Sequence, residues 1–211
     1  MKTIYLVRHG ESDVNAGPIL EGPKSPLTAK GRDQSSLIAE RAQKLPIEII
    51  ISSTMQRAKE TALAIQEKTG KYVEFSDLFI ERQRPSHHYG LDKTDPKALG
   101  EWRKIVENFA TPTFKLFDEE NFEDLKKRAR EALRHLEDRP ENNILVVSHG
   151  TFMRVMMGEV LFGSNFTAPE CLQLFKTTMA KNTGITVLVY NTEKAPPFWQ
   201  LLAWNDHAHL G

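Results

Sequence analysis

The feature that most constrains this chain is an apolar run near its start that ends in a cation, an imidazole and a glycine. Residues 4–7 (Ile-Tyr-Leu-Val) predict a buried β-strand, and Arg8, His9 and Gly10 follow where that strand should end. In an open α/β sheet, ligands bind at the carboxyl ends of the strands. A neutral imidazole is a competent nucleophile, and an adjacent guanidinium both disfavours the protonated imidazole and suits a phosphate. The run therefore predicts a histidine that attacks phosphorus, although by itself it is equally compatible with an incidental histidine at a strand end.

The same pattern occurs again late in the chain. Residues 144–147 (Ile-Leu-Val-Val) predict another buried strand, which ends in Ser148, His149 and Gly150, and Thr151 begins the following helix. Parallel strands joined by right-handed crossovers bring their carboxyl ends to one edge of a sheet. We therefore expect both histidines to lie at that edge.

A third strand end contributes an arginine. Residues 47–51 predict a buried strand, residues 52–54 are capping residues for the next helix, and Arg57 lies in the first turn of that helix, beside the apolar position Ala58. This placement favours a side chain that faces the crevice over a solvated one, the commonest location of a helical arginine. Two imidazoles and two guanidiniums at one edge could neutralise a phosphoryl group in transfer without a metal.

Phosphoryl transfer also needs an acid for the leaving alkoxide, and Glu81 is the candidate. It follows the apolar residues 78–80, so partial desolvation could raise its pKa and keep a proton available. Spacing alone favours the other interpretation, in which Glu81 forms an ion pair with Arg82 or Arg84.

The rest of the pattern predicts an α/β fold in one domain over residues 1–211. Helix caps or stops are predicted at Thr28, Pro46, Gly70, Asn121, Pro140 and Gly163. The inward faces of the first and last of these helices are predicted to include Leu37, Ile38, Ala42, Leu45, Phe152, Val155, Met156 and Leu161. Further strands are predicted over residues 72–75, 171–175, 184–190 and 199–204. A proline-rich turn separates the last two strands, which indicates an antiparallel pair at a sheet edge.

Residues 86–120 interrupt this alternation, and we expect them to cover the crevice and to determine substrate selectivity. Asp95 and Pro96 predict the start of a helix. Its apolar stripe consists of Leu99, Trp102, Ile105, Val106 and Phe109. We expect this stripe to pack rather than to bind a ligand. No metal is expected at His87 and His88, because adjacent side chains point apart on regular elements and no carboxylate cluster flanks them.

Composition narrows the class of partner. The chain has 28 basic and 28 acidic residues, which gives no support for a nucleic-acid or membrane partner. Cys171 is the only cysteine, so an intrachain disulfide and a cysteine-based zinc site are excluded. The first apolar run is too short for a signal peptide and no stretch has the length of a membrane span, so we expect a cytoplasmic protein. Trp199 or Trp204 could pair two subunits in a homodimer, although packing in the core explains them equally well.

Together these motifs resemble those of the histidine phosphatase superfamily, also called the phosphoglycerate-mutase-like family. The matching positions are residues 6–12 (Leu-Val-Arg-His-Gly-Glu-Ser), Asn15, Leu27, Thr28, Gly31, Gln34, Ser52, Ser53, Arg57, Ala58, Thr61, Ala62, Glu81, residues 146–150 (Val-Val-Ser-His-Gly) and His209-Leu210. The resemblance spans nearly the whole chain. It implies a three-layer α/β/α sandwich with a mostly parallel central sheet, and a phosphohistidine intermediate. We expect no cofactor and no metal.

The resemblance also implies roles for individual residues. His9 would be the nucleophile, and Glu81 would be first the general acid and then the base that activates water. The residues implied to hold the phosphoryl oxygens are Arg8, Arg57 and His149, with Asn15 supporting them. The other expected substrate-binding residues are Gly22, Arg82, Arg84, Gly150 and Thr151.

Two departures favour the phosphatase branch of the family over the mutases. Mutases usually place a basic residue and a glutamine or threonine just before the glycine of their substrate loop, whereas this chain has Ile19 and Glu21 before Gly22. Residues 82–86 (Arg-Gln-Arg-Pro-Ser) are similar to the phosphatases. We therefore expect a metal-independent hydrolase of a small phosphorylated metabolite; the alternatives are a phosphoglycerate-type mutase and a phospho-ligand binding module without turnover.

Overall fold

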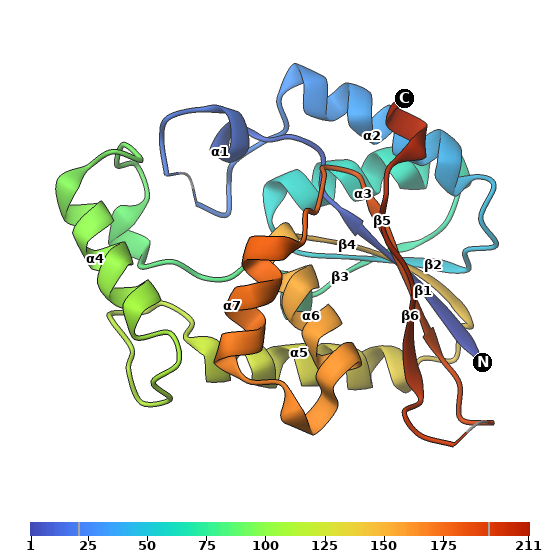
Figure 1. The fold of residues 1–211 in the computed structure, drawn as a ribbon. Coiled ribbons are helices and arrows are strands. Elements are labelled where there is room, and N and C mark those ends of the chain that lie inside the picture. Colours follow the sequence, from blue (N-terminus) through green and yellow to red (C-terminus); the bar gives the residue numbers. More distant parts are fainter. Residues whose placement is uncertain (21, 194) are drawn as a thin grey trace.

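A β-sheet forms the centre of the computed structural model, which describes residues 1–20, 22–193 and 195–211 (Figure 1). Its strands are β1 (Lys2–Arg8), β2 (Ile49–Ser52), β3 (Val73–Phe75), β4 (Asn143–Ser148), β5 (Ile185–Tyr190) and β6 (Trp199–Asp206). Their order across the sheet is β3-β2-β4-β1-β5-β6. The pairs among β3, β2, β4 and β1 are parallel, whereas β5 is antiparallel to both β1 and β6. The predicted mostly parallel sheet with an antiparallel pair at its edge is confirmed.

Helices cover both faces of this sheet, so the predicted three-layer sandwich is confirmed as well. The helices on one face are α2 (Ala29–Ala42) and α3 (Gln56–Thr69), and those on the other are α5 (Phe122–Glu137), α6 (Gly150–Phe162) and α7 (Ala168–Thr177) (Figure 1). Successive side chains of a strand point to opposite faces. Accordingly, Leu6 and Val146 pack in the core cluster under α5 and α6, and Val7 and Val147 pack in the cluster under α2 and α3.

The remaining helical elements are short or lie at the margin of the sheet. They are α1 (Asp13–Ala16), α4 (Pro96–Glu107) and the 3₁₀ turns η1 (Asp77–Phe79), η2 (Ser86–His88), η3 (Gly163–Asn165) and η4 (Ala208–Leu210). Over the described ranges, no helix is both long enough and apolar enough to cross a membrane.

Several predicted helix ends are confirmed by their cap geometry. The Thr28 side chain accepts a hydrogen bond from the backbone N–H of Gly31 at 3.0 Å, and Asn121 forms a capping box with Asp124. Helix α3 ends at Gly70, whose φ of 67° lies in the left-handed region that favours glycine.

The strand predicted at residues 171–175 is wrong, because this segment belongs to α7. The buried residues of α7 are Ala168, Cys171 and Leu174, which recur every three positions as on a helix face, and Pro169 occupies the first turn. A short apolar run does not distinguish a strand from a buried helix by itself.

Three smaller predictions also need correction. Leu37 and Leu161 are 40% and 48% exposed, because small residues such as Ala39 and Gly158 fill the inward positions of α2 and α6. Residues 52–54 do not cap α3, which starts after Met55 without a side-chain cap.

Helix α4 lies outside the three layers, at the end of the molecule next to the α1 loop (Figure 1). Ile105 and Phe109 of its stripe are buried, as expected for packing residues. Leu99 and Val106 are 47% and 41% exposed, so the packing interpretation is wrong for these two. The rest of this segment bears on the site described next.

Candidate active site

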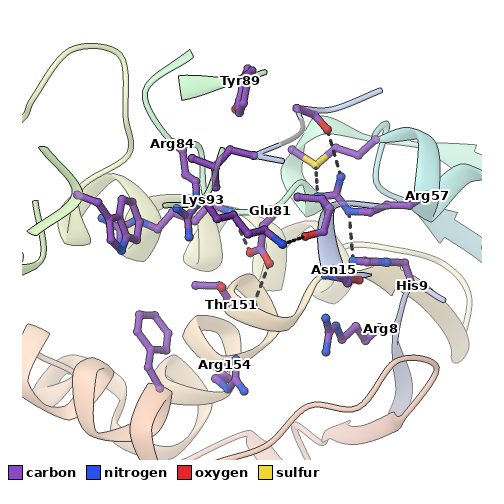
Figure 2. Close-up of a pocket in the computed structure, with 17 residues that line it drawn as sticks. Arg8, His9, Asn15, Arg57, Glu81, Arg84, Tyr89, Lys93, Thr151 and Arg154 are labelled. Carbon is purple, nitrogen blue, oxygen red and sulfur yellow. Dashed lines mark hydrogen bonds between the residues drawn. The ribbon is translucent and has the colours of Figure 1, made fainter. Parts of the chain in front are cut away.

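A cavity of about 360 Å³ opens where β1 ends, and most of the predicted site residues line it (Figure 2). The predicted residues on its wall are Arg8, His9, Asn15, Gly22, Arg57, Glu81, Arg82, Arg84 and Thr151. His149 and Gly150 are not on the wall. A volume of this size suits a small metabolite, since small-molecule sites typically measure roughly 300–1,000 Å³.

His9 is buried at the end of β1 with its ring held by two hydrogen bonds. Its Nδ1 lies 2.6 Å from the carbonyl oxygen of Gly10, and Arg57 Nε–H donates to its Nε2 at 3.2 Å. A carbonyl oxygen only accepts, so Nδ1 carries the proton and Nε2 carries the lone pair. The structure therefore turns a nucleophilic nitrogen toward the cavity side, where Arg57 lies.

Arg57 comes from the first turn of α3 and is 5% exposed. Its other guanidinium nitrogens donate to the carbonyl oxygen of Gly22 at 3.4 Å and to Met55 Sδ at 3.2 Å. The predicted crevice-facing orientation of Arg57 is confirmed. A buried guanidinium beside an unprotonated imidazole nitrogen is suited to neutralise a phosphoryl group.

Arg8 lies on the other side of His9, and its guanidinium is held by the chain beyond α7. Its Nη1 donates to the carbonyl oxygen of Ala180, whereas its buried Nε has no hydrogen-bond partner among the described residues. Gly150 leaves space for this group, since a Cβ there would lie 3.3 Å from Arg8 Nε. Gly150, predicted to bind the substrate, lies off the cavity wall and instead makes room for Arg8.

His149 lies beside His9, as the paired strand ends predict. The centroids of the two rings are 4.9 Å apart, and β1 pairs with β4 through Arg8 and Ser148. His149 Nε2 lies 2.8 Å from Ser53 Oγ, and its buried Nδ1 has no partner within the described chain.

Both imidazoles are kept neutral by their surroundings. Burial, followed by the charges of Arg57 and Arg8, lowers the pKa of His9 well below its usual value. Burial, Arg57, His9 and Arg8 lower the pKa of His149 in the same direction. At neutral pH His9 therefore carries the lone pair that a nucleophile needs.

Glu81 is anchored by backbone donors at the start of α6. Its Oε1 accepts from the backbone N–H groups of Arg82 at 2.9 Å and Phe152 at 3.0 Å, and its Oε2 accepts from that of Thr151 at 3.1 Å. The apolar surroundings expected from residues 78–80 are therefore replaced by three hydrogen bonds. Thr151 thus contributes to the site through its backbone N–H, which holds Glu81.

The expected ion pair of Glu81 with Arg82 is wrong, because Arg82 has other partners. Its Nη2 donates to the buried Glu119 at 3.1 Å, and its Nε donates to the carbonyl oxygen of Glu120. Arg84 instead stacks on the indole of Trp102, with 3.9 Å between its Cζ and the ring centroid. No carboxylate of the described ranges forms an ion pair with Arg84.

Gly22 and Asn15 shape the opposite wall. A Cβ on Gly22 would lie 3.0 Å from the ring of Tyr89, so glycine allows that ring to approach. Asn15 Oδ1 accepts hydrogen bonds from the backbone N–H of Ser12 at 3.3 Å and from Asn182 Nδ2 at 3.4 Å, which ties the loop after β1 to the loop before β5. Glu21, which departs from the mutase pattern, lies outside the described residues.

Sequence reasoning missed several residues of the cavity wall. Among them are Tyr89, Lys93, Trp102, Arg154 and Phe175 (Figure 2). Arg154 could have been found, because it lies one helical turn after Thr151. Lys93 Nζ donates to the carbonyl oxygens of Val14 at 2.8 Å and Gly17 at 2.5 Å, a contact between distant segments that spacing does not reveal.

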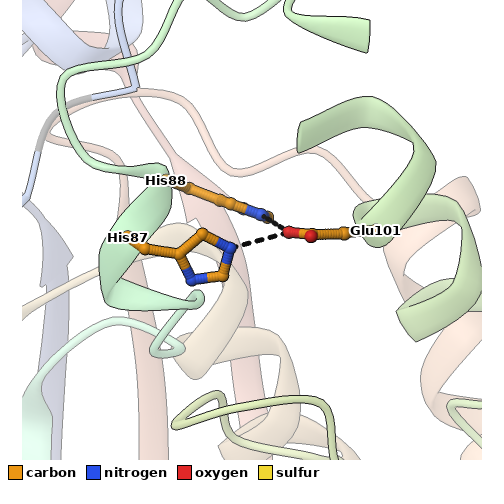
Figure 3. A group of neighbouring side chains, drawn as sticks. All are labelled: His87, His88 and Glu101. Atoms are coloured by element: carbon orange, nitrogen blue, oxygen red, sulfur yellow. Dashed lines mark hydrogen bonds and ion pairs between the residues drawn. The ribbon is translucent and has the colours of Figure 1, made fainter. Parts of the chain in front are cut away.

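The argument against a metal at His87 and His88 is wrong in its geometry. Both Nε2 atoms lie 2.7 Å from the same oxygen, Glu101 Oε2, so the two rings converge on a carboxylate (Figure 3). The reason is that the two histidines lie in a tight 3₁₀ turn, η2, and α4 brings Glu101 opposite that turn.

Comparison with known proteins identifies a matching family and a relative. The family model of the histidine phosphatase superfamily (branch 1) matches residues 4–207. The probable phosphoglycerate mutase GpmB of Shigella boydii serotype 18 is 34% identical over 167 residues, which cover 76% of this chain and 75% of the relative.

Two solved structures share the fold at lower identity. A mycobacterial glucosyl-3-phosphoglycerate phosphatase in complex with VO3 has a TM-score of 0.78 at 23% identity, covering 98% of this chain and 100% of its own. The phosphoserine phosphatase of Entamoeba histolytica in complex with 3-phosphoglyceric acid has a TM-score of 0.76 at 21% identity, covering 100% of both chains.

Proposed function

The chain belongs to the histidine phosphatase superfamily (branch 1), and we propose that it is a metal-independent phosphomonoester hydrolase that acts on a small phosphorylated metabolite through a phosphohistidine intermediate. The single observation that carries this proposal is the buried His9, whose unprotonated nitrogen Nε2 accepts a hydrogen bond from Arg57. A protonated nitrogen at this position could not attack phosphorus, and the lowered pKa of His9 keeps it unprotonated.

In the first half-reaction, His9 Nε2 attacks phosphorus and the bond from phosphorus to the ester oxygen breaks. Arg57 and Arg8 neutralise the charge on the phosphoryl oxygens, which is the main catalytic requirement of phosphoryl transfer. Arg8 Nε and His149 Nδ1 are both buried and without described partners, so they are available for further polar contacts with the phosphoryl group. Glu81 donates a proton to the departing alkoxide.

In the second half-reaction, Glu81 as a carboxylate takes a proton from water, the water oxygen attacks phosphorus, and the bond to His9 Nε2 breaks. Inorganic phosphate leaves, and His9 and Glu81 return to their starting protonation states. The backbone donors of Thr151 and Phe152 hold Glu81 in one position for both steps. A fixed carboxyl group can act as acid and then as base without a conformational change.

The substrate is proposed to carry a second anionic group beside its phosphate. Arg84 lies on the cavity wall, stacked on Trp102, and its guanidinium donates no hydrogen bond to any acceptor in the described chain. Burial, followed by the charge of Arg82, lowers the pKa of Arg84, and a buried cation of this kind is stabilised by an anionic ligand. A phosphorylated carboxylic acid fits this arrangement better than an uncharged phosphate ester does. Residues 86–120, which provide Tyr89 and Lys93, are accordingly proposed as the source of selectivity.

A phosphoglycerate-type mutase is the second candidate, favoured by the 34% identity to a probable phosphoglycerate mutase. It uses the same attack and the same acid, but returns the phosphoryl group to a second hydroxyl of the substrate. Ile19, at a position where mutases usually carry a basic residue, favours the hydrolase. Product analysis with and without a bisphosphate primer separates the two: a primer-dependent isomerised phosphate ester would establish the mutase.

The direct test is a panel of phosphorylated metabolites, assayed for release of inorganic phosphate in the presence of a chelator. The hydrolase predicts turnover in chelator and its loss in His9→Ala. Tight binding without turnover, and without a phosphorylated protein, would instead support a phospho-ligand binding module.

A further inference from the structure

Two histidines and a glutamate meet at one point on the segment that borders the cavity, outside the catalytic residues (Figure 3). His87 and His88 lie in η2, and Glu101 lies in the second turn of α4. Both imidazole Nε2 atoms are 2.7 Å from Glu101 Oε2, and the candidate ligand atoms of the three residues all lie within 4.8 Å of one another. Nothing in the proposed phosphoryl transfer uses these residues.

The present separations of these atoms, 2.7 Å for each Nε2–Oε2 pair and at most 4.8 Å within the group, lie on either side of the spacing in the first shell of a metal ion. A tetrahedral zinc ion has N and O ligands at about 2.0–2.2 Å, which places the ligand atoms roughly 3.3 Å from one another. Metal binding therefore requires the three side chains to move so that their ligand atoms reach that separation. Two imidazoles and one carboxylate, with water as a fourth ligand, form a ligand set that zinc uses in proteins.

Burial and charge favour the same interpretation. His88 is 1% exposed, yet Glu101 is the only described hydrogen-bond partner of its ring, because its Nδ1 is buried without one. Asp118 adds a further negative charge close to His87, through its hydrogen bond with the backbone N–H of Ser86 at 2.9 Å.

We propose that His87, His88 and Glu101 form a binding site for a divalent transition-metal ion of the zinc class. Imidazole nitrogens select zinc, cobalt or nickel over magnesium and calcium, which prefer oxygen ligands. This ion has no part in phosphoryl transfer, since the site shares no residue with the group around His9.

The position of the site gives the ion a positioning role. The site joins η2 to α4. The residues that follow two of its ligands in the sequence, Tyr89 and Trp102, both lie on the cavity wall. Arg84 stacks on Trp102, so a metal ion that fixes this wall also fixes the Arg84 guanidinium, which is proposed to bind the second anionic group of the substrate. This functional part rests on the proposed hydrolase, and it predicts that the metal lowers KM and leaves kcat unchanged.

Metal binding is tested without reference to activity. The full-length protein is treated with chelator, and Co²⁺ is titrated while the visible absorption of a tetrahedral cobalt site is recorded; Zn²⁺ then displaces the cobalt. Stoichiometric binding with this spectrum is expected. The variants Glu101→Gln and His87→Asn alter partly exposed side chains, and the affinity for Co²⁺ should fall at least about tenfold in each. Loss of a residue that only supports a metal ligand already lowers metal affinity by about that factor.

The matched control is His135→Asn, which removes a histidine that lies 3.8 Å from the single carboxylate of Glu74. Its cobalt spectrum and affinity should equal those of the unchanged protein. Absence of stoichiometric Co²⁺ and Zn²⁺ binding, or binding that both site variants retain, would overturn the proposal. If binding is found but KM does not respond to metal, the site stands and only its positioning role is lost; if no phosphatase activity exists, the cobalt titration still decides the metal site.

Discussion

Replacing Glu81 by glutamine tests the assignment of the proton donor, because the change is nearly isosteric and replaces the ionisable carboxyl group by an amide that cannot supply the proton. General acid catalysis typically contributes about 10²–10⁴ in rate. The expected loss for an alkyl phosphate therefore corresponds to about 3–5 kcal/mol in the activation barrier. An aryl phosphate, whose leaving group needs no proton, should lose much less in its first half-reaction.

The structure also predicts what Glu81→Gln does to the fold. The amide oxygen of the variant can still accept hydrogen bonds from the backbone N–H groups of Arg82 and Phe152. The amide nitrogen, however, would face the backbone N–H of Thr151, which donates to Glu81 Oε2 in the unchanged protein. Leaving one such donor unpaired costs about 1–3 kcal/mol. The variant should therefore be folded but less stable, as measured by urea denaturation.

The assay compares kcat/KM of the two proteins for an alkyl and an aryl phosphate, with the burst of alcohol or phenol release reporting the first half-reaction. Arg103→Ala, an exposed substitution on α4, serves as the control for handling and stability. Equal losses for both substrates, or a loss below about tenfold for the alkyl phosphate, would refute the role of Glu81 as the acid.

Three further predictions concern the cations and the imidazoles. Arg57→Ala should lower kcat/KM by about 10²–10³, because a preorganised donor to the transferring group is lost, and steady-state kinetics measure this; a loss below tenfold would contradict it. Arg84→Ala should raise KM for a phosphorylated carboxylic acid by about tenfold and leave an aryl phosphate nearly unaffected, whereas Arg103→Ala should change neither; equal effects on the two substrates would remove the second-anion subsite. Burial and the neighbouring arginines lower the pKa of His9 and His149, so the folded protein binds protons at these imidazoles less readily than the unfolded chain does. The stability gained from the neutral imidazoles is therefore complete above about pH 6.5 and is lost as the pH falls below that value. Denaturation at pH 7 and pH 5 should show this decline, with a smaller one in His149→Asn, and the acid limb of kcat/KM should lie below pH 6.5; a limb at or above that pH would contradict a neutral, buried His9.

The parts of the fold that follow from sequence are those with a strong local cause. Buried runs such as residues 144–147 have few alternatives to a parallel strand, and residues such as Thr28 and Gly70 carry their own cap geometry. The strand ends of β1 and β4 then bring His9 and His149 together, because parallel pairing fixes the register between them. Residues 171–175 were ambiguous because five apolar or polar positions do not separate a period of two from one of three or four.

The parts that do not follow from sequence depend on the path of the chain in space. Arg82 pairs with Glu119, which lies 37 positions away, and Lys93 reaches the carbonyl oxygen of Val14 across 79 positions. Likewise, no periodicity places Glu101 against His87 and His88, because their contact depends on the turn between η2 and α4. The proposed catalytic centre is thus encoded by short local patterns, whereas the wall proposed to select the substrate is not.

The account depends most on covalent chemistry at His9, and trapping the intermediate tests this directly. The protein is mixed with a radiolabelled phosphorylated substrate from the active panel, quenched in alkali within the first turnover, digested and mapped. The account predicts an adduct that is stable in alkali and labile in acid, as a phosphoramidate is, on the peptide that contains His9, and its absence in His9→Ala. A labelled peptide elsewhere in the chain, or sustained turnover by His9→Ala without any adduct, would contradict it.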